Sequence, residues 1–176
     1  MSSARKAVFL DRDGVINRRP PEGLYINSLA EFEILPGVNE AIAQLNQHGY
    51  LVIVATNQRC IARGIVAAEV VTQIHEHMLR ESAATGAEIA HIYVCPHDYS
   101  DACECRKPKP GMLLQAAQDY SLDLAQSWMV GDSASDVGAG RAARCRTVLV
   151  GDDDGVGADF MAHDLGEAVR KILSAS

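Results

Sequence analysis

The stretch that decides the fold is Val8-Phe9-Leu10-Asp11-Arg12-Asp13-Gly14-Val15-Ile16-Asn17. Its apolar beginning predicts a buried strand over residues 6–10. Two carboxylates, Asp11 and Asp13, follow this strand, and in open α/β sheets ligands bind beyond the carboxyl ends of the strands. Because two acids this close repel each other, a cation or a shared proton is expected between them. The alternative is an Asp-rich turn that closes the strand, with Gly14 supplying the turn geometry.

The bulk composition is that of an ordinary globular chain. Its 176 residues are enough for one domain, residues 1–176, and two domains would be cramped. The net charge of −7 argues against a general nucleic-acid binder. No apolar run reaches the length of a membrane span, and the N-terminus has no signal-peptide pattern. We therefore expect a cytoplasmic monomer that acts on a small molecule, with neither nucleic acid nor a membrane as its partner.

Strands and helices are expected to alternate along the chain. Further buried strands are predicted at residues 50–55, 89–94, 127–130 and 147–150. Apolar residues at helical spacing predict helices after Pro36-Gly37, over 68–85, after Pro110-Gly111, around 136–143 and after Asp164. In the third of these helices we expect Leu113, Leu114 and Ala117 to face the core. The alternation predicts an α/β fold with a central parallel sheet, a Rossmann-like three-layer sandwich.

Two segments fall outside this alternation. Residues 17–36 are irregular and too few for a cap domain, so they are expected to form at most a flap over the site. An acidic, glycine-containing loop is expected over residues 151–157.

Polar residues follow three of the predicted strands, namely Asp11 with Asp13, Thr56 with Asn57, and Asp132. If these strand ends converge, the three aspartates form an all-oxygen site suited to Mg²⁺. Thr56 and Asn57 would supply neutral hydrogen-bond donors, and Lys107 a fixed positive charge. Such a set is suited to phosphoryl transfer.

Four ordered motifs carry a family resemblance: Phe9-Leu10-Asp11-Arg12-Asp13-Gly14, Thr56-Asn57-Gln58, Arg106-Lys107-Pro108 and Gly131-Asp132-Ser133-Ala134-Ser135-Asp136. They resemble the motifs of the haloacid dehalogenase (HAD) superfamily of phosphatases, over nearly the whole chain. The resemblance implies a HAD-like fold without a cap. It also implies that Asp11 is a nucleophile that forms an aspartyl-phosphate, and that Asp13 is the general acid and base.

The same resemblance implies the remaining site residues. Thr56, Asn57 and Lys107 would bind the transferring phosphoryl group. Mg²⁺ would be held by Asp11, by Asp13 through its main-chain carbonyl, and by Asp132. Asp136 is left as a residue behind the metal or at the start of a helix.

The second constellation is the Cys/His loop at residues 95–105. Cys95, His97, Cys103 and Cys105 match the Cys₃His set of a closed structural zinc site. The loop has no hydrophobic periodicity, so a bound Zn²⁺ would supply its order and position Lys107, two residues further on. The alternatives are a reduced cysteine cluster without metal and a redox role, and the odd count of five cysteines argues against a disulfide framework. The other histidines, which fit no constellation, are expected mostly at the surface or on helix faces: His48, His75, His77, His91 and His163.

Within the superfamily, the zinc loop, Thr-Asn-Gln and Arg-Lys-Pro resemble two groups of small cap-less phosphatases. One acts on D-glycero-D-manno-heptose 1,7-bisphosphate and the other on histidinol phosphate. Residues 61–64 and 107–112 are more similar to the heptose group, which implies hydrolysis of the C7 phosphate. Gln58, Arg59 and Arg106 are the candidates for substrate binding, because Arg is the usual bidentate partner of phosphate. The heptose group usually has Ser-Gly where this chain has Arg59-Cys60.

Two readings from other classes stay open. One is a phosphatase of polynucleotide ends, against which the acidic balance counts. The other is a binding module without catalysis, against which the intact aspartates count.

Overall fold

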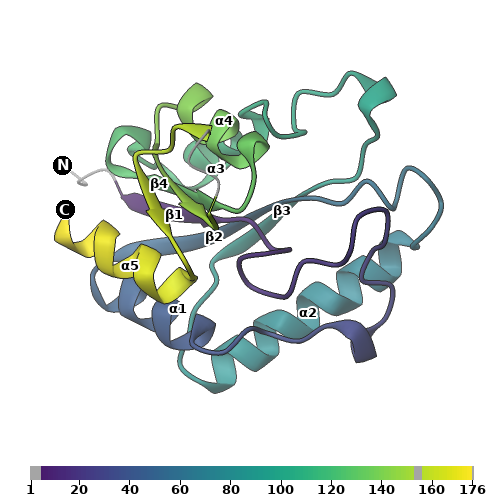
Figure 1. Cartoon of the computed structure of the whole chain (residues 1–176), viewed down its shortest axis with the longest axis horizontal. Coiled ribbons are helices and arrows are strands. Elements are labelled where there is room, and N and C mark those ends of the chain that lie inside the picture. Colours follow the sequence, from purple (N-terminus) through teal and green to yellow (C-terminus); the bar gives the residue numbers. More distant parts are fainter. Residues whose placement is uncertain (1–4, 153–155, 176) are drawn as a thin grey trace.

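The computed structural model describes residues 5–152 and 156–175. A six-stranded parallel sheet lies at its centre (Figure 1). Part of the acidic loop expected over 151–157 therefore lies outside the described residues. The strands are β1 (Lys6–Leu10), β2 (Tyr50–Asn57), β3 (His91–Cys95), β4 (Trp128–Gly131), β5 (Arg146–Val150) and β6 (Phe160–Ala162). Their order across the sheet is β3-β2-β1-β4-β5-β6.

The direction in which successive strands are added to the sheet reverses beside β1, and this reversal determines where the candidate site lies. The chain runs outward from β1 through β2 to β3, then returns to lay β4 on the other side of β1. Leu10 lies opposite both Val54 and Val130 in the parallel register. Residues just beyond these positions therefore leave the sheet at one edge, and the Asp11 N–H donates to Val130 O at 2.9 Å. A crevice at such a switch point is where open α/β sheets bind ligands.

Helices cover both faces of the sheet and complete the predicted three-layer sandwich. The α-helices are α1 (Val38–Gln47), α2 (Ala68–Ala84), α3 (Gly111–Tyr120), α4 (Ala134–Ala142) and α5 (Leu165–Ser174). Figure 1 shows α1, α2 and α5 on one side of the sheet, and α3 and α4 on the other. Alternate residues of β1 enter two separate cores: Val8 and Leu10 pack on the first side, and Ala7 and Phe9 on the second.

Most predicted elements are confirmed, with shifts at their ends. Strand β2 continues through Asn57, two residues beyond the predicted strand. Helix α4 begins at Ala134, because the Ser133 hydroxyl and the Asp136 carboxylate form a capping box there. Strand β6 was not predicted, since three residues are too few to show a pattern.

The predicted core face of α3 is right only in part, since Leu113 is buried as expected, Ala117 is half-buried and Leu114 is exposed. In α3 the buried residues are Met112, Leu113 and Ala116, whereas Leu114 is 43% exposed. The helix begins at Gly111, so Met112, Leu113 and Ala116 are its second, third and sixth residues, and this spacing puts them on the face toward the sheet.

Residues 17–36 form the expected irregular flap, which includes the 3₁₀ turn Leu29–Glu31. The Leu35 N–H donates to Ile16 O at 2.8 Å, which closes the flap at its base. Two further 3₁₀ turns, Tyr99–Asp101 and Leu124–Gln126, lie in later loops. Among the described residues, no helix combines the length and the apolar character needed to cross a membrane.

Candidate active site and metal centres

A buried ammonium lies between two carboxylates at the centre of the site. Lys107 Nζ is 2.8 Å from Asp11 Oδ1 and 2.6 Å from Asp136 Oδ1, and it donates to Ala55 O at 2.7 Å. Burial, followed by the charge of Asp136, raises the pKa of Asp11 to about 7. Burial alone would lower the pKa of Lys107, but Asp11 and Asp136 outweigh it and raise that pKa. The lysine is therefore a fixed positive charge beside Asp11.

The three carboxylates of Asp11, Asp132 and Asp136 each offer an oxygen within 4.8 Å of the others. Asp132 Oδ2 accepts from Arg19 Nη1 at 3.1 Å, whereas its buried Oδ1 has no hydrogen-bond partner among the described residues. Burial raises the pKa of Asp132 to about 6. An unpartnered carboxylate oxygen in a buried site is costly, and a hard cation that prefers oxygen ligands would offset that cost. The donor set fits Mg²⁺.

Gly14 lies against this acidic group. Its φ is +97°, and a Cβ there would fall 1.9 Å from Asp132 Oδ2. A glycine at this position is required both by the backbone conformation and by the space that the Asp132 carboxylate occupies.

The Asp13 side chain belongs to a separate group of hydrogen bonds. Arg12 Nη2 donates to both of its oxygens, at 2.7 and 3.0 Å, while Asn17 Nδ2 donates at 2.9 Å and Gln58 Nε2 at 3.0 Å. Burial acts to raise the pKa of Asp13, but the Arg12 charge and these hydrogen bonds outweigh it and lower the pKa. These contacts hold the Asp13 side chain as a carboxylate.

The end of β2 connects these two groups. Gln58 Nε2 donates to Thr56 Oγ1 at 2.8 Å as well as to Asp13. The Asn57 amide pairs with the main chain of Lys107 in both directions, at 3.1 and 3.2 Å. Asn57 therefore fixes the backbone that carries the lysine.

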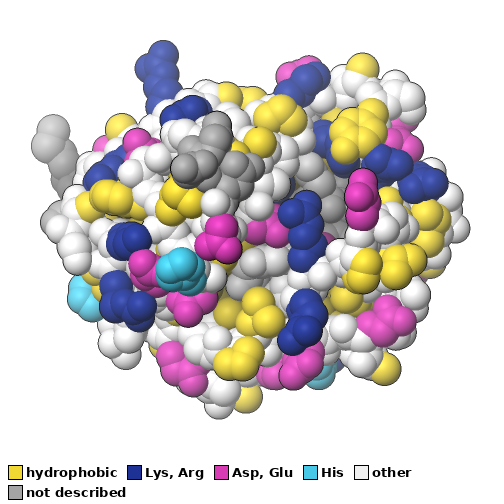
Figure 2. Space-filling model, viewed as in Figure 1, with side chains coloured by type: hydrophobic (Ala, Val, Ile, Leu, Met, Phe, Trp, Pro, Cys, Tyr) yellow, Lys and Arg dark blue, Asp and Glu magenta, His cyan; other side chains and the backbone are white. Residues whose placement is uncertain are grey.

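Arginines border the cavity above the carboxylates. The cavity has a volume of about 720 Å³. Arg59 and Arg106 lie over the Tyr99 ring, 4.9 and 4.2 Å from its centroid, and Arg59 also pairs with Asp98 at 3.1 Å. Figure 2 shows Lys and Arg side chains around a hollow in the face in view. Charged residues that line the cavity are Asp11, Asp13, Arg19, Glu22, Arg59, Arg63, Arg106, Lys107 and Asp136.

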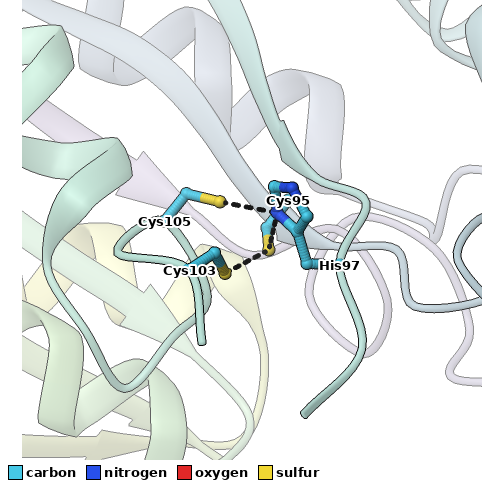
Figure 3. A group of neighbouring side chains, drawn as sticks. All are labelled: Cys95, His97, Cys103 and Cys105. Carbon is cyan, nitrogen blue, oxygen red and sulfur yellow. Dashed lines mark hydrogen bonds between the residues drawn. The ribbon is translucent and has the colours of Figure 1, made fainter. Parts of the chain in front are cut away.

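The Cys/His loop brings its four predicted ligands together (Figure 3). Cys95 Sγ lies 3.7 Å from Cys103 Sγ and 3.6 Å from His97 Nδ1, and His97 Nδ1 lies 3.2 Å from Cys105 Sγ. A tetrahedral zinc with ordinary bond lengths sets its sulfur atoms about 3.8 Å apart and its sulfur and nitrogen about 3.6 Å apart. The donor set and its spacing fit a structural Zn²⁺.

Two connections were not predicted from the sequence. His75 is only 6% exposed on the inner face of α2, and its Nε2 lies 3.1 Å from Arg12 Nη1. The signal for its burial was its place beside Ile74 and four residues after Val71, on the apolar face of the helix. Asp136 caps α4 through Ser133, which is one of the two roles left open for it, and it also contacts Lys107, which was not predicted.

Comparison with known proteins places the chain in one class of enzymes. The HAD-hydrolase-like family model matches residues 104–168. The D-glycero-beta-D-manno-heptose-1,7-bisphosphate 7-phosphatase of Pseudomonas aeruginosa is 46% identical over 153 residues, which cover 87% of this chain and 85% of that protein. The protein of the same name from Haemophilus influenzae is 36% identical and covers 94% of this chain and 95% of its own.

A solved structure agrees with these relatives. The D,D-heptose 1,7-bisphosphate phosphatase from B. bronchiseptica, complexed with magnesium and phosphate, superposes with a TM-score of 0.88 at 36% identity, covering 97% of this chain and 99% of that one. The fold and site thus define a HAD-type phosphatase, a phosphoric monoester hydrolase. Within that class, the chain belongs to the family of the D-glycero-β-D-manno-heptose-1,7-bisphosphate 7-phosphatases.

Proposed function

We propose that the protein hydrolyses the C7 phosphate of D-glycero-D-manno-heptose 1,7-bisphosphate in a Mg²⁺-dependent reaction. The observation that carries the proposal is the Asp11 carboxylate, fixed by Lys107 beside the unpartnered oxygen of Asp132 and facing an arginine-bordered cavity. The names of the relatives, and a structural neighbour complexed with magnesium and phosphate, support the same reaction.

Asp11 is the proposed nucleophile. One of its oxygens attacks the phosphorus, the bond between phosphorus and the sugar oxygen breaks, and the phosphoryl group is carried as an aspartyl-phosphate. Water then attacks the phosphorus and releases inorganic phosphate and the free carboxylate. A Mg²⁺ held by Asp11, Asp132 and the Asp13 carbonyl would offset the charge on the phosphoryl oxygens in both steps. Lys107 adds a second positive charge at the same place, and Thr56 and Asn57 complete the proposed phosphoryl site.

Asp13 is the proposed proton carrier. In the second step it takes a proton from the attacking water, and the carboxylate form that Arg12 and Gln58 favour is the form needed. In the first step it must give a proton to the sugar oxygen. The negative charge of an arriving phosphate raises the pKa of Asp13, which favours the protonated form when the substrate is in place.

The second phosphate of the substrate would lie against the arginines. Arg59 and Arg106 are held near Tyr99, and they line the same cavity as Asp11 and Gln58. A bisphosphate can therefore engage Asp11 at one end and guanidinium groups at the other. Histidinol phosphate carries an ammonium instead of a second phosphate, and this cavity wall would repel it.

A structural Zn²⁺ on Cys95, His97, Cys103 and Cys105 would order the loop that leads to Lys107. We further propose that the protein is a cytoplasmic monomer that acts on a small phosphorylated sugar. Sedimentation of the purified protein tests whether it is a monomer.

The test of the function is Mg²⁺-dependent phosphate release from both anomers of the heptose bisphosphate, from histidinol phosphate and from a 5′-phosphorylated oligonucleotide. We expect a large preference in kcat/KM for one heptose anomer, with release only at C7. A preference for histidinol phosphate or for the oligonucleotide would overturn the substrate. Absence of turnover on every phosphate ester would favour the binding module.

A further inference from the structure

We propose that His75 is a positioning residue that, through Arg12, holds the carboxylate of Asp13 where it exchanges protons with the substrate. The inference rests on the proposed role of Asp13 in the reaction. His75 lies on α2, outside the four family motifs and the lining of the cavity, and it does not touch Asp13 itself.

The contact consists of two hydrogen-bonded steps. Arg12 Nη1 lies 3.1 Å from His75 Nε2. On its other side the same guanidinium forms a fork with Asp13, from Nε at 3.1 Å and from Nη2 at 2.7 and 3.0 Å. Arg12 is 1% exposed and His75 6%, so water has little access to either group.

The direction of the first hydrogen bond follows from its chemistry. A guanidinium has N–H groups and no acceptor, so Arg12 must donate and His75 Nε2 must accept. The imidazole is therefore neutral, with its proton on Nδ1. Burial, followed by the Arg12 charge, lowers the pKa of His75 to about 4, which agrees with a neutral ring.

The position of His75 on a packed helix allows its contact with Arg12 to orient the guanidinium. Helix α2 is 17 residues long, and Ile74 and Met78 anchor its inner face in the core. Arg12 lies instead in the turn after β1, where its carbonyl accepts from the Ile16 N–H at 2.8 Å. An acceptor on a packed helix therefore selects one orientation for a long side chain that starts from a turn. That orientation sets the direction of the Asp13 carboxylate, and proton transfer is sensitive to shifts of this kind.

The kinetic test compares His75→Leu, which removes the acceptor, with His75→Gln, whose amide oxygen can still accept from Arg12. Each variant is assayed on the heptose bisphosphate and on p-nitrophenyl phosphate, whose leaving group departs without a proton. For His75→Leu we expect kcat/KM to fall about tenfold on the sugar and by less than about twofold on the nitrophenyl ester. His75→Gln is expected to recover most of the loss on the sugar.

His77 provides the matched control. It lies two residues further along α2, is 41% exposed and pairs with Glu81, so His77→Leu is expected to leave both rates unchanged. An equal fall on both substrates in His75→Leu would indicate a general structural role and overturn the proposal. Unchanged rates on both substrates would overturn it too.

A second measurement separates this proposal from the proposed function. The ¹⁵N spectrum of the wild-type imidazoles reports which nitrogen of His75 carries the proton. We expect the Nδ1–H form; an Nε2–H form, or a protonated ring at neutral pH, would overturn the contact whatever the substrate. If the wild type hydrolyses another alkyl phosphate but not the heptose bisphosphate, the function fails. The comparison of leaving groups is then made on that ester.

Discussion

The ammonium of Lys107 lies 2.8 Å from the carboxylate of Asp11, and the two side chains are 1% and 13% exposed. Lys107 also lies 2.6 Å from Asp136, so one positive charge faces two negative ones in a buried setting. Burial, followed by the second negative charge of Asp136, raises the pKa of Asp11 to about 7, and the excess negative charge is the imbalance that a divalent cation would remove.

Removing that ammonium tests its structural role. Lys107→Met leaves Asp11 and Asp136 buried without their partner, and breaking a buried pair costs about 3–5 kcal/mol. We expect the free energy of unfolding, measured in urea at pH 7 without divalent cations, to fall by about that amount. Lys107→Met combined with Asp136→Asn is expected to recover part of the loss. The matched control is Lys109→Met, at a 44% exposed lysine, and it is expected to change stability little.

Asp11→Asn removes the proposed nucleophile while it keeps the size of the side chain. Phosphate release is expected to disappear, with the far-ultraviolet circular dichroism spectrum unchanged. The amide can still accept from Lys107, so the local geometry is retained. Turnover well above background in this variant would remove Asp11 from the nucleophilic role.

Asp13→Asn removes the proton carrier but leaves the main-chain carbonyl in place. We expect kcat to fall by about 10²–10⁴-fold, the usual contribution of general acid–base catalysis. The affinity for Mg²⁺, measured by titration calorimetry, is expected to change little. If kcat were unchanged, another group would have to transfer the proton.

The Cys/His cluster is tested by its metal content. Elemental analysis is expected to find about one zinc per chain. Cys105→Ser should lower both the zinc content and the melting temperature, because the loop loses the bound ion that orders it. Cys145→Ser is the matched control, since Cys145 is buried far from the cluster in the sequence and is not one of its ligands. A zinc-free preparation with full activity and stability would reject the site.

The buried imidazole of His75 predicts a loss of stability in acid. Its pKa is about 4 in the folded protein against 6.5 for a free histidine, so the unfolded chain takes up the proton first. The contribution is complete above pH 6.5 and is lost as the pH falls toward 4, by up to about 3 kcal/mol at 1.36 kcal/mol per pKa unit. Arg12 and Asp13 are the charged groups that act on this histidine.

The difference between wild type and His75→Gln isolates this effect from other titrations. Urea unfolding from pH 8 to pH 4.5 is expected to show a shallower decline for the variant. Parallel declines would mean that the His75 ring takes up its proton without penalty in the folded protein.

The sequence predicted the parts of the protein that repeat a local pattern. The strand before Asp11 is confirmed as Lys6–Leu10, because a buried central strand is an uninterrupted apolar run. The clustering of Cys95 with Cys105 followed from ligand spacing within one short loop. Contacts between distant segments were harder to predict. Nothing in the spacing of the apolar residues of α2 indicates that His75 contacts Arg12 in the turn after β1.

Exposed helix positions were also misjudged. Leu114 was predicted in the core because it is apolar, yet the face of α3 that packs on the sheet carries Met112, Leu113 and Ala116, and Leu114 lies outside that face. Hydrophobicity says which residues can be buried, and the face of the helix that packs on the sheet decides which of them are.

Gly14 has a consequence for how the sequence can vary. A side chain there would meet the Asp132 carboxylate, and the positive φ separately disfavours any residue with a Cβ. A residue of the fourth motif, Asp132, therefore restricts which residue the first motif can carry. As long as Asp132 keeps its position, only glycine is tolerated at position 14. Conversely, in a related chain with another residue at position 14, we expect the residue that corresponds to Asp132 to have changed or moved.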